Sequence, residues 1–455
     1  MTKTWNQLFI RHGWLVVELA DGTFDFAQET DENRMFLQNS LKSVGVDHTF
    51  LGDRLTIFGP AVEEELFIEA INFRRRGIGE GLAYRNSRIA DLDVYVAGVV
   101  RQLNRLGFKT VTSCDGHGMR RSLVVAQRLT EKDEAILSIV GFDRVRPSHR
   151  NGELKLECRE RNTLLDVAER LAILDSDLLK KGPAHIQETF FQHRLEHLLE
   201  IPGDSGNESE VRVYVMEELS PLVDHLTVDH AGNILAERTY RNGNGPTILL
   251  NAHLDTVEPI EPGRNILKDG PIWSSSRGIL GADDRAGVAI LLELANMLHQ
   301  TSCFSGKVKF IFTVQEECGL LGAREVSDHF LWGTDAAFVV DRRGTGDIVT
   351  SCGGTIPFCD PVYGNFLETL ASGGGLEGWK AVQGGSSDTR IWASHGIQSV
   401  NLSVGYRDEH TEEESLDVSA CYSTLQLLKT ILQNGRQIRQ VIRQINRPNI
   451  LREAL

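Results

Sequence analysis

Apolar and polar positions alternate most regularly in the part of the chain that begins near residue 186. Continuous apolar segments predict buried strands, and segments whose apolar residues recur every three or four positions predict helices. In chain order these are helices at 189–201 and 207–223, a strand at 247–257, a helix at 283–300, strands at 307–317 and 335–341, a helix at 387–396, a strand at 397–405 and a long closing helix at 419–445. This alternation predicts an α/β fold with a mixed, largely parallel sheet and helices on both faces, in which function gathers at the carboxyl ends of the strands.

The first 180 residues carry shorter segments, which predict a separate α+β domain. Strands are expected at 14–20, 54–59, 108–113, 122–127 and 154–160, and helices at 92–106 and 162–174. A polar stretch that contains Gly182-Pro183 separates this part from the next. We therefore expect an α+β domain at 1–180, a second domain at 186–445 and a tail at 446–455. The sequence shows no internal repeat.

Composition and charge narrow the class of protein. The formal net charge of −15 disfavours nucleic acid as a partner. The seven cysteines, an odd number without a CxxC pair, indicate neither a disulfide framework nor a thiolate zinc site. The first residues lack the apolar core of a signal peptide, and no apolar run is long enough to span a membrane. These features predict a cytoplasmic protein with reduced thiols and no membrane association.

Acidic and imidazole side chains follow the predicted strands of the second domain or begin its helices. They are His253 and Asp255 after the first strand, Asp283 in GADDRAG, the pair Glu316-Glu317, Asp341, and His410 in a late loop. Each has an ordinary explanation by itself; for example, Asp283 or Asp284 can cap a helix. Two adjacent acids after an apolar strand, however, place like charges where burial is costly, and bound cations offset that cost. Two imidazoles with several carboxylates form a donor set that suits zinc, or manganese or cobalt.

The order of these motifs resembles the two-zinc exopeptidases, which include bacterial leucine aminopeptidases, peptidase T and glutamate carboxypeptidases. The motifs are NAHLDTV, GADDRAG, QEECGLLGA, VVDRRG and the late His410, with LLEIPGDSGNESEVRVYV and DHAGNILAE before them and GGSSDTRIWASHGIQSVNLSVG before the last ligand. The resemblance covers about residues 186–440 and does not extend to the first 180 residues.

The resemblance implies a site with two zinc ions. The metal ligands would be His253, Asp283, Glu317, Asp341 and His410. Asp283 would bridge the two ions, while Glu317 and Asp341 would divide between them. Asp255 would orient His253, and Glu316 would be the general base for a hydroxide that bridges the metals. The resemblance also implies a cis peptide bond between Asp283 and Asp284, which needs a functional reason.

Two departures from the family pattern favour the aminopeptidases that have no lid. Only 69 positions separate Asp341 from His410, and Gln383 stands where peptidase T has an arginine that can hold a substrate carboxylate. We therefore expect a metallo-aminopeptidase that hydrolyses short peptides from the amino terminus. A carboxypeptidase or an N-acyl amino acid deacylase with the same metals is the alternative. A binding or scaffold relative without turnover is a second alternative, which the intact pair Glu316-Glu317 disfavours.

The first domain has its own cluster, Cys114-Asp115-Gly116-His117, which suggests a nucleophile or a metal site. A polar turn with glycine in special dihedrals is the favoured interpretation. The Gly-rich and partly cationic loops 74–81 and 114–121 offer contacts for a peptide. We expect this domain to limit access to the zinc site, in its own chain or across a homo-oligomer, with independent partner binding as the alternative.

Overall fold

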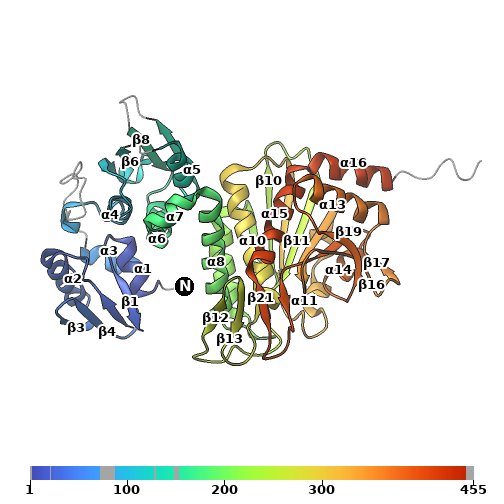
Figure 1. Cartoon of the computed structure of the whole chain (residues 1–455), viewed down its shortest axis with the longest axis horizontal. Coiled ribbons are helices and arrows are strands. Elements are labelled where there is room, and N and C mark those ends of the chain that lie inside the picture. Colours follow the sequence, from blue (N-terminus) through green and yellow to red (C-terminus); the bar gives the residue numbers. More distant parts are fainter. Residues whose placement is uncertain (1–2, 21, 72–87, 128–129, 148–152, 447–455) are drawn as a thin grey trace, which may run out of the picture. The chain divides into compact units, whose positions relative to one another are not determined.

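The computed structural model describes residues 3–20, 22–71, 88–127, 130–147 and 153–446. The chain divides into two units, Met1–Phe190 and Phe191–Leu455, and the division falls within helix α8 (Pro183–Glu200) (Figure 1). Each unit has its own hydrophobic core. None of the described helices is long and apolar enough to cross a membrane. The loop 74–81 and the tail from residue 447 lie outside the described residues.

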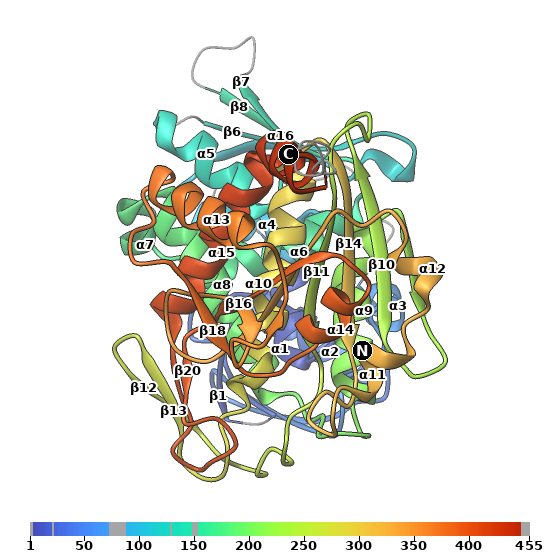
Figure 2. The same cartoon turned by 90° about the vertical axis from the view of Figure 1, so that its right-hand side faces the viewer.

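The second unit is built on a nine-stranded sheet. Its strands are β9 (His225–Val228), β10 (Ile234–Tyr240), β11 (Thr247–His253), β14 (Gly306–Thr313), β15 (Ala336–Arg342), β16 (Asp347–Cys352), β17 (Ile356–Pro357), β18 (Lys380–Gly384) and β19 (Gln398–Ser403). The order is β17-β16-β19-β15-β11-β14-β10-β9, and β18 pairs with β16. The central strands β14, β11, β15 and β19 are parallel, whereas β10 joins β14 antiparallel. Figure 2 shows β10, β14 and β11 side by side. The expected mixed, largely parallel α/β sheet is therefore confirmed.

Helices cover both faces of this sheet. They are α9 (Ser209–Leu219), α10 (Ala282–Thr301), α11 (Leu321–Glu325), α12 (Asp328–Leu331), α13 (Pro361–Gly373), α14 (Thr389–Ser394), α15 (Val418–Gln433) and α16 (Gly435–Ile445), together with part of α8. Leu249 of β11 packs in a cluster with Trp392 of α14, while its neighbours Ile248 and Leu250 pack in the cluster that includes α10 and α15. Successive side chains of a strand face opposite sides, so a strand covered on both faces is apolar throughout.

The prediction of one closing helix at 419–445 is wrong in one respect, because the structure has two helices there, which meet at Asn434. The backbone of Asn434 leaves the helical region, with φ of −102° and ψ of 24°. Its side-chain amide donates to the carbonyl of Thr430 at 2.9 Å and so competes with the regular helical pattern. Gly435 then lies so close to Phe304 that a Cβ atom there would approach the ring within 3.0 Å.

A small antiparallel sheet completes the second unit. Its strands are β12 (Ile266–Asp269), β13 (Ile272–Ser275), β20 (Tyr406–Arg407) and β21 (Ser415–Asp417), in the order β12-β13-β21-β20. The pairing of β20 with β21 places residues on either side of the loop that carries His410 next to each other. This loop is therefore anchored at both of its ends.

The first unit contains two halves with the same order of elements. The first half is α1 (Trp5–Arg11), β1 (Val17–Ala20), β2 (Thr23–Asp25), α2 (Asp31–Ser43), β3 (Asp47–Leu51), β4 (Arg54–Phe58) and α3 (Glu64–Ile71). The second half is α4 (Ala97–Arg105), β5 (Thr110–Cys114), β6 (Ser122–Gln127), α5 (Glu131–Val140), β7 (Arg144–Pro147), β8 (Glu153–Cys158) and α6 (Asn162–Ile173). The two antiparallel sheets have matching orders, β1-β2-β4-β3 and β5-β6-β8-β7. The expected α+β class of this part is confirmed.

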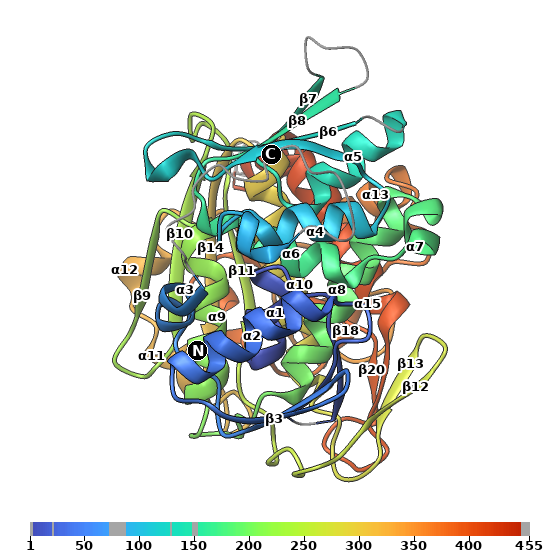
Figure 3. The ribbon, with the colours of Figure 1, turned by 90° about the vertical axis from the view of Figure 1, so that its left-hand side faces the viewer.

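The expectation that the chain has no internal repeat is therefore wrong at the level of topology. Short stretches of sequence correspond between the halves: Val44-Gly45-Val46-Asp47 ends α2, and Val140-Gly141-Phe142-Asp143 ends α5. Gly45 and Gly141 both have a positive φ, of 71° and 118°, which glycine adopts without strain after a helix. Helices α1, α4 and α6 contact one another in the core of the unit (Figure 3).

Candidate functional site

The predicted metal ligands meet at one edge of the large sheet. His253 is the last residue of β11, Asp341 lies near the end of β15, and Glu317 follows β14. The parallel register pairs His253 with Thr313 of β14, so the ends of these strands lie at the same edge. Asp283 comes from the start of α10, and His410 comes from the loop between β20 and β21.

The carboxylate of Asp283 lies between two imidazoles. Its Oδ1 is 3.1 Å from Nε2 of His253, and its Oδ2 is 3.2 Å from Nε2 of His410. Asp341 Oδ1 is 3.7 Å from Nε2 of His253, while Glu317 Oε1 is 2.7 Å from Nε2 of His410. The geometry thus groups Asp341 with His253 and Glu317 with His410 around a shared carboxylate.

Asp284, the alternative to Asp283, uses its carboxylate differently. Its Oδ2 accepts from the backbone N–H of His253 at 3.1 Å, and its Oδ1 accepts from the backbone N–H of Gly287 at 3.1 Å. Asp284 therefore ties the start of α10 to the end of β11. The peptide bond between Asp283 and Asp284 is cis, as the resemblance implies.

Asp255 holds the acid pair more directly than it holds the histidine. Its Oδ1 accepts from the backbone N–H of Glu316 at 2.9 Å, and its Oδ2 accepts from that of Glu317 at 3.1 Å and from the hydroxyl of Ser205 at 2.7 Å. His253 Nδ1 is 3.0 Å from the backbone oxygen of Asp255 and 3.4 Å from its Oδ1. Asp255 thus contacts the predicted histidine and also fixes the backbone of both acids, a role that the sequence did not suggest.

Burial and like charges govern the electrostatics of the site. Burial, followed by the charge of Asp341, raises the pKa of Glu316 to about 10. Burial also raises the pKa of Glu317 to about 7. For Asp283 burial acts in the same direction, but hydrogen bonds to His253 and His410 outweigh it and lower the pKa. A bound cation reverses the local pKa balance and favours the ionised carboxylates. An acidic cluster of this kind is therefore suited to cations.

The side chains present fit divalent metal ions. His253 forms one group of donor atoms with Asp283 and Glu317 and another with Asp284 and Asp341, and within each group the atoms lie within 4.8 Å of one another. These nitrogen and oxygen donors are the ones that zinc prefers, and carboxylate–histidine contacts of this type are typical of zinc sites.

Four further residues hold the site, and the sequence reasoning missed them. Glu414 is buried and accepts from the backbone N–H groups of Gly281 at 2.6 Å and Asp283 at 3.1 Å. The Tyr406 hydroxyl donates to Asp341 Oδ1 at 2.9 Å. Glu414 stands in the run TEEE, which resembles a solvated acidic loop, and Tyr406 resembles an ordinary strand residue. No local signal in the sequence marks either of them.

The other two missed residues are Asn401 and Asp388. Asn401 accepts from the backbone N–H of Asp341 and donates to its backbone oxygen, at 3.0 and 2.7 Å. Asp388 is buried and accepts from the hydroxyl of Thr313 at 2.5 Å, and burial raises its pKa to about 7. Asp388 ends the GGSSD motif, whose order in the chain was the only available sign of a role.

A set of imidazoles and carboxylates at the carboxyl edge of an α/β sheet, buried or half-buried except for the exposed His410, is typical of metal-dependent hydrolases. Residues 233–434 match Peptidase family M28. The matched residues lie within the second unit and include the strand ends that carry the cluster, so this unit resembles a metallopeptidase domain.

Relatives and solved structures are similar to parts of this chain. The uncharacterised protein YqjE of Bacillus subtilis is 29% identical over 163 residues, which are 34% of this chain and 43% of that protein, so the chain spans less than half of this relative. A putative aminopeptidase of Acetivibrio thermocellus is 24% identical over 318 residues, covering 50% of this chain and 94% of that protein. The structure of aminopeptidase PepT from Bacillus cereus aligns with a TM-score of 0.49 and 18% identity over 54% of this chain and 98% of that chain.

Proposed function

We propose that the chain removes residues from the amino terminus of short peptides with the aid of two zinc ions. The observation that carries the proposal is the Asp283 carboxylate, whose two oxygens face His253 and His410 at 3.1 and 3.2 Å. Two cations close together need a shared anion, and this carboxylate can supply it. Asp341 would complete the ligands around His253, and Glu317 would complete those around His410. Manganese or cobalt would suit the same donors.

Glu316 is our choice for the general base. Its backbone is held by Asp255 in the same way as that of Glu317, yet no hydrogen bond or ion pair joins its carboxylate to another residue in the described part of the chain. When bound, zinc would lower the pKa of a water molecule and polarise the scissile carbonyl. The Glu316 carboxylate would take the proton of the attacking water and return it to the leaving amine.

The chain between Asp341 and His410 supports an aminopeptidase over a carboxypeptidase. It forms β16 to β20 with α13 and α14, and most of its strands belong to the large sheet or extend it. This segment therefore has no room for an inserted lid domain. Gln383, at the position that would carry an arginine for a substrate carboxylate, is exposed and uncharged. A free amino terminus is thus the expected requirement, with the carboxypeptidase or N-acyl deacylase as the alternative.

A metal-reconstituted assay tests this proposal. Zinc-loaded protein should cleave peptides with a free amino terminus, and Glu316→Gln should keep its metal while losing turnover by ~10²-fold, the scale of general base catalysis. His253→Ala and His410→Ala should each lose metal by elemental analysis. Hydrolysis of N-acetylated peptides at rates that match the free ones would replace the aminopeptidase with a deacylase. Full metal content without turnover on any peptide would indicate the scaffold alternative.

We further propose that the first unit restricts which substrates reach the zinc site, in its own chain or across a homo-oligomer. An enzyme for short peptides must exclude folded proteins and keep bulk water, other than the attacking molecule, away from the reacting carbonyl. The segment between Asp341 and His410 supplies no lid for this purpose, and the first unit is the remaining part of the chain without a role. The seven free cysteines are in keeping with action in the cytoplasm.

A further inference from the structure

The two halves of the first unit differ most at one hairpin connection. In the first half, two residues separate Ala20 at the end of β1 from Thr23 at the start of β2. In the second half, β5 and β6 are joined by the seven residues 115–121, which include the short helix η2 (Gly116–Gly118). Both copies are otherwise built on the same plan, so the longer loop is not required by the fold. Extra residues on a rigid scaffold are where binding sites are commonly found.

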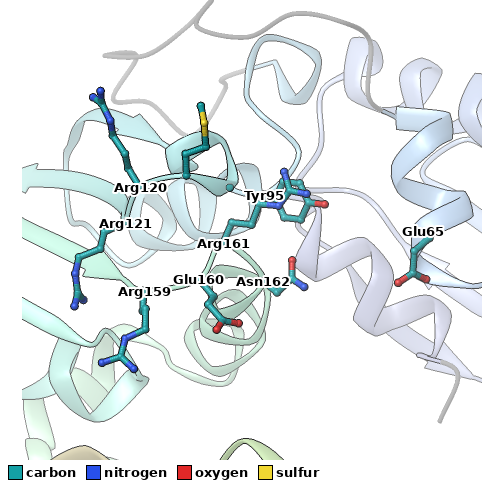
Figure 4. A pocket seen from close by; sticks show the side chains of 10 residues that line it. Glu65, Tyr95, Arg120, Arg121, Arg159, Glu160, Arg161 and Asn162 are labelled. Atoms are coloured by element: carbon teal, nitrogen blue, oxygen red, sulfur yellow. The ribbon is translucent and has the colours of Figure 1, made fainter.

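This longer loop lines a pocket with a volume of about 610 Å³. The loop contributes Arg120 and Arg121, and the segment after β8 contributes Arg159 and Arg161 (Figure 4). The pairing of Ser122 with Cys158 brings the two segments together at the same end of the sheet. The matching position in the first half, after β4, reads Gly59-Pro60-Ala61 and carries no arginine. The arginines therefore belong to the copy that has the enlarged loop.

Among the described residues, the guanidinium groups of three of these arginines have no partner of opposite charge. No ion pair or hydrogen bond joins the guanidinium group of Arg120, Arg121 or Arg159 to another residue in the described parts of the chain, although the backbone N–H of Arg159 donates to the carboxylate of Asp143. By contrast, Arg34 of the same unit lies 2.5 Å from Asp53. In Figure 4, Arg121 and Arg159 extend towards the same side from neighbouring segments. Unpaired guanidinium groups that share a pocket are a ready site for an anion.

The other lining residues and the pocket volume indicate the charge and the size of a ligand that would fit. Arg161 lies over the ring of Tyr95, with 4.1 Å from its Cζ to the ring centroid, and is 3.8 Å from Asp115. Glu65 and Glu160 also line the pocket, so the lining holds four arginines and two glutamates, while the carboxylates of Asp115 and Asp143 lie next to it. A chain with a net charge of −15 thus concentrates positive charge at this place. The volume suits a small molecule.

A cation is a poorer occupant of the same region. The side chains of Cys114, Asp115 and His117 have donor atoms within 4.8 Å of one another. Asp115, however, already accepts from the backbone N–H of His117 at 2.9 Å, which forms the polar turn expected from the sequence. The neighbouring arginines raise the electrostatic cost of a cation still further.

We propose that this pocket binds the oxyanion group of a small molecule, either a phosphate or a carboxylate. A guanidinium group matches both of these groups with two parallel N–H···O bonds, and arginine recognises them through the same geometry. The proposal does not rest on the peptidase activity, because every residue that it uses lies in the first unit. It gives that unit a ligand-binding role.

Isothermal titration calorimetry of the full zinc-loaded chain tests the proposal, with inorganic phosphate and N-acetylglycine as separate probes. We expect saturable binding of at least one probe, and the tighter one identifies the anion. The double variant Arg121→Ala/Arg159→Ala should weaken this binding at least tenfold, the scale of lost charge-assisted hydrogen bonds. Arg54→Ala, on the exposed start of β4, is the matched control and should leave binding unchanged.

Three outcomes overturn the proposal. One is the absence of saturable binding of either probe to the wild-type chain. Another is binding that survives the double substitution, since the anion would then occupy the zinc site or another surface. The third is binding of an RNA oligonucleotide without binding of either small probe. Circular dichroism on heating checks that the double variant is folded, and the single variant Arg121→Lys, which keeps the charge but loses the paired geometry, should bind less tightly than wild type.

Discussion

Replacement of Asp255 by asparagine is the sharpest test of how the proposed zinc site is held. The Asp255 carboxylate is buried and accepts three hydrogen bonds, from the backbone of Glu316 and Glu317 and from Ser205, at 2.7 to 3.1 Å. Asparagine has nearly the same shape but offers a single acceptor oxygen. Its NH₂ group would then face an N–H or O–H donor, so at least one of these bonds is lost.

The size of the effect follows from the bond that is lost. A hydrogen bond to a charged group contributes roughly 1.5–3 kcal/mol, and a tenfold change corresponds to about 1.4 kcal/mol. Because Asp255 holds the backbone of Glu317, the loss should reach the metal ligand itself. We expect Asp255→Asn to weaken zinc binding by about 10- to 100-fold, the range seen for groups that support metal ligands.

Competition for zinc with a chromophoric chelator measures this affinity, and turnover at saturating zinc separates metal binding from chemistry. Asp417→Asn is a matched control, because the Asp417 carboxylate accepts from the backbone N–H groups of Ser419 and Ala420 at the start of α15. The control removes a half-buried carboxylate charge but keeps an oxygen that can accept both bonds, so it should leave the zinc affinity unchanged. Zinc affinity within twofold of wild type for Asp255→Asn would refute the proposed role of Asp255.

Three other outcomes are expected. Glu317→Gln should weaken metal binding, and a variant that retains both metals but loses turnover would show that the roles of the two adjacent acids are reversed. In the first unit, burial raises the pKa of Glu64, but hydrogen bonds from His12 and Arg11 outweigh it and lower the pKa to about 2 from 4.5. Ionised Glu64 therefore stabilises the fold above about pH 4.5, and this stabilisation is lost as the pH falls towards 2. The unfolding temperatures of wild type and Glu64→Gln should converge at acid pH. A difference in unfolding temperature that stays constant with pH would contradict this linkage. A fragment of residues 186–455 should cleave longer peptides and lose its preference for short ones, and unchanged length preference would refute restriction by the first unit.

The strand ends of the second unit could be predicted from the sequence because parallel strands bring their carboxyl ends to one edge. His253 and Asp341 end apolar runs, so their proximity follows from topology alone. The supporting contacts could not be predicted in this way. Glu414 reaches the backbone of Gly281 across more than a hundred residues of sequence. A contact of that kind leaves no periodic pattern in the chain.

The duplicated topology of the first unit was missed for a related reason. Two halves with the same strand order need only the same alternation of apolar and polar residues and turns at the same places. Many different sequences satisfy these requirements. The glycines that end α2 and α5 are among the few positions where geometry demands the same residue in both halves. The loop 115–121 interrupts the correspondence, and the pocket arginines lie in this loop and in the segment after β8.

Five carboxylates of the proposed zinc site divide into two groups by what they contact. Asp255, Asp284 and Glu414 accept hydrogen bonds from backbone N–H groups, whereas Asp283 and Glu317 face imidazoles. Hydrogen bonds to the backbone require no metal. The first group can therefore hold the backbone that carries the second group when no metal is bound. The second group keeps like charges together at a cost that falls when a cation binds. The fold would thus position the proposed ligands before a metal binds, and the metal would supply the charge that makes this arrangement stable.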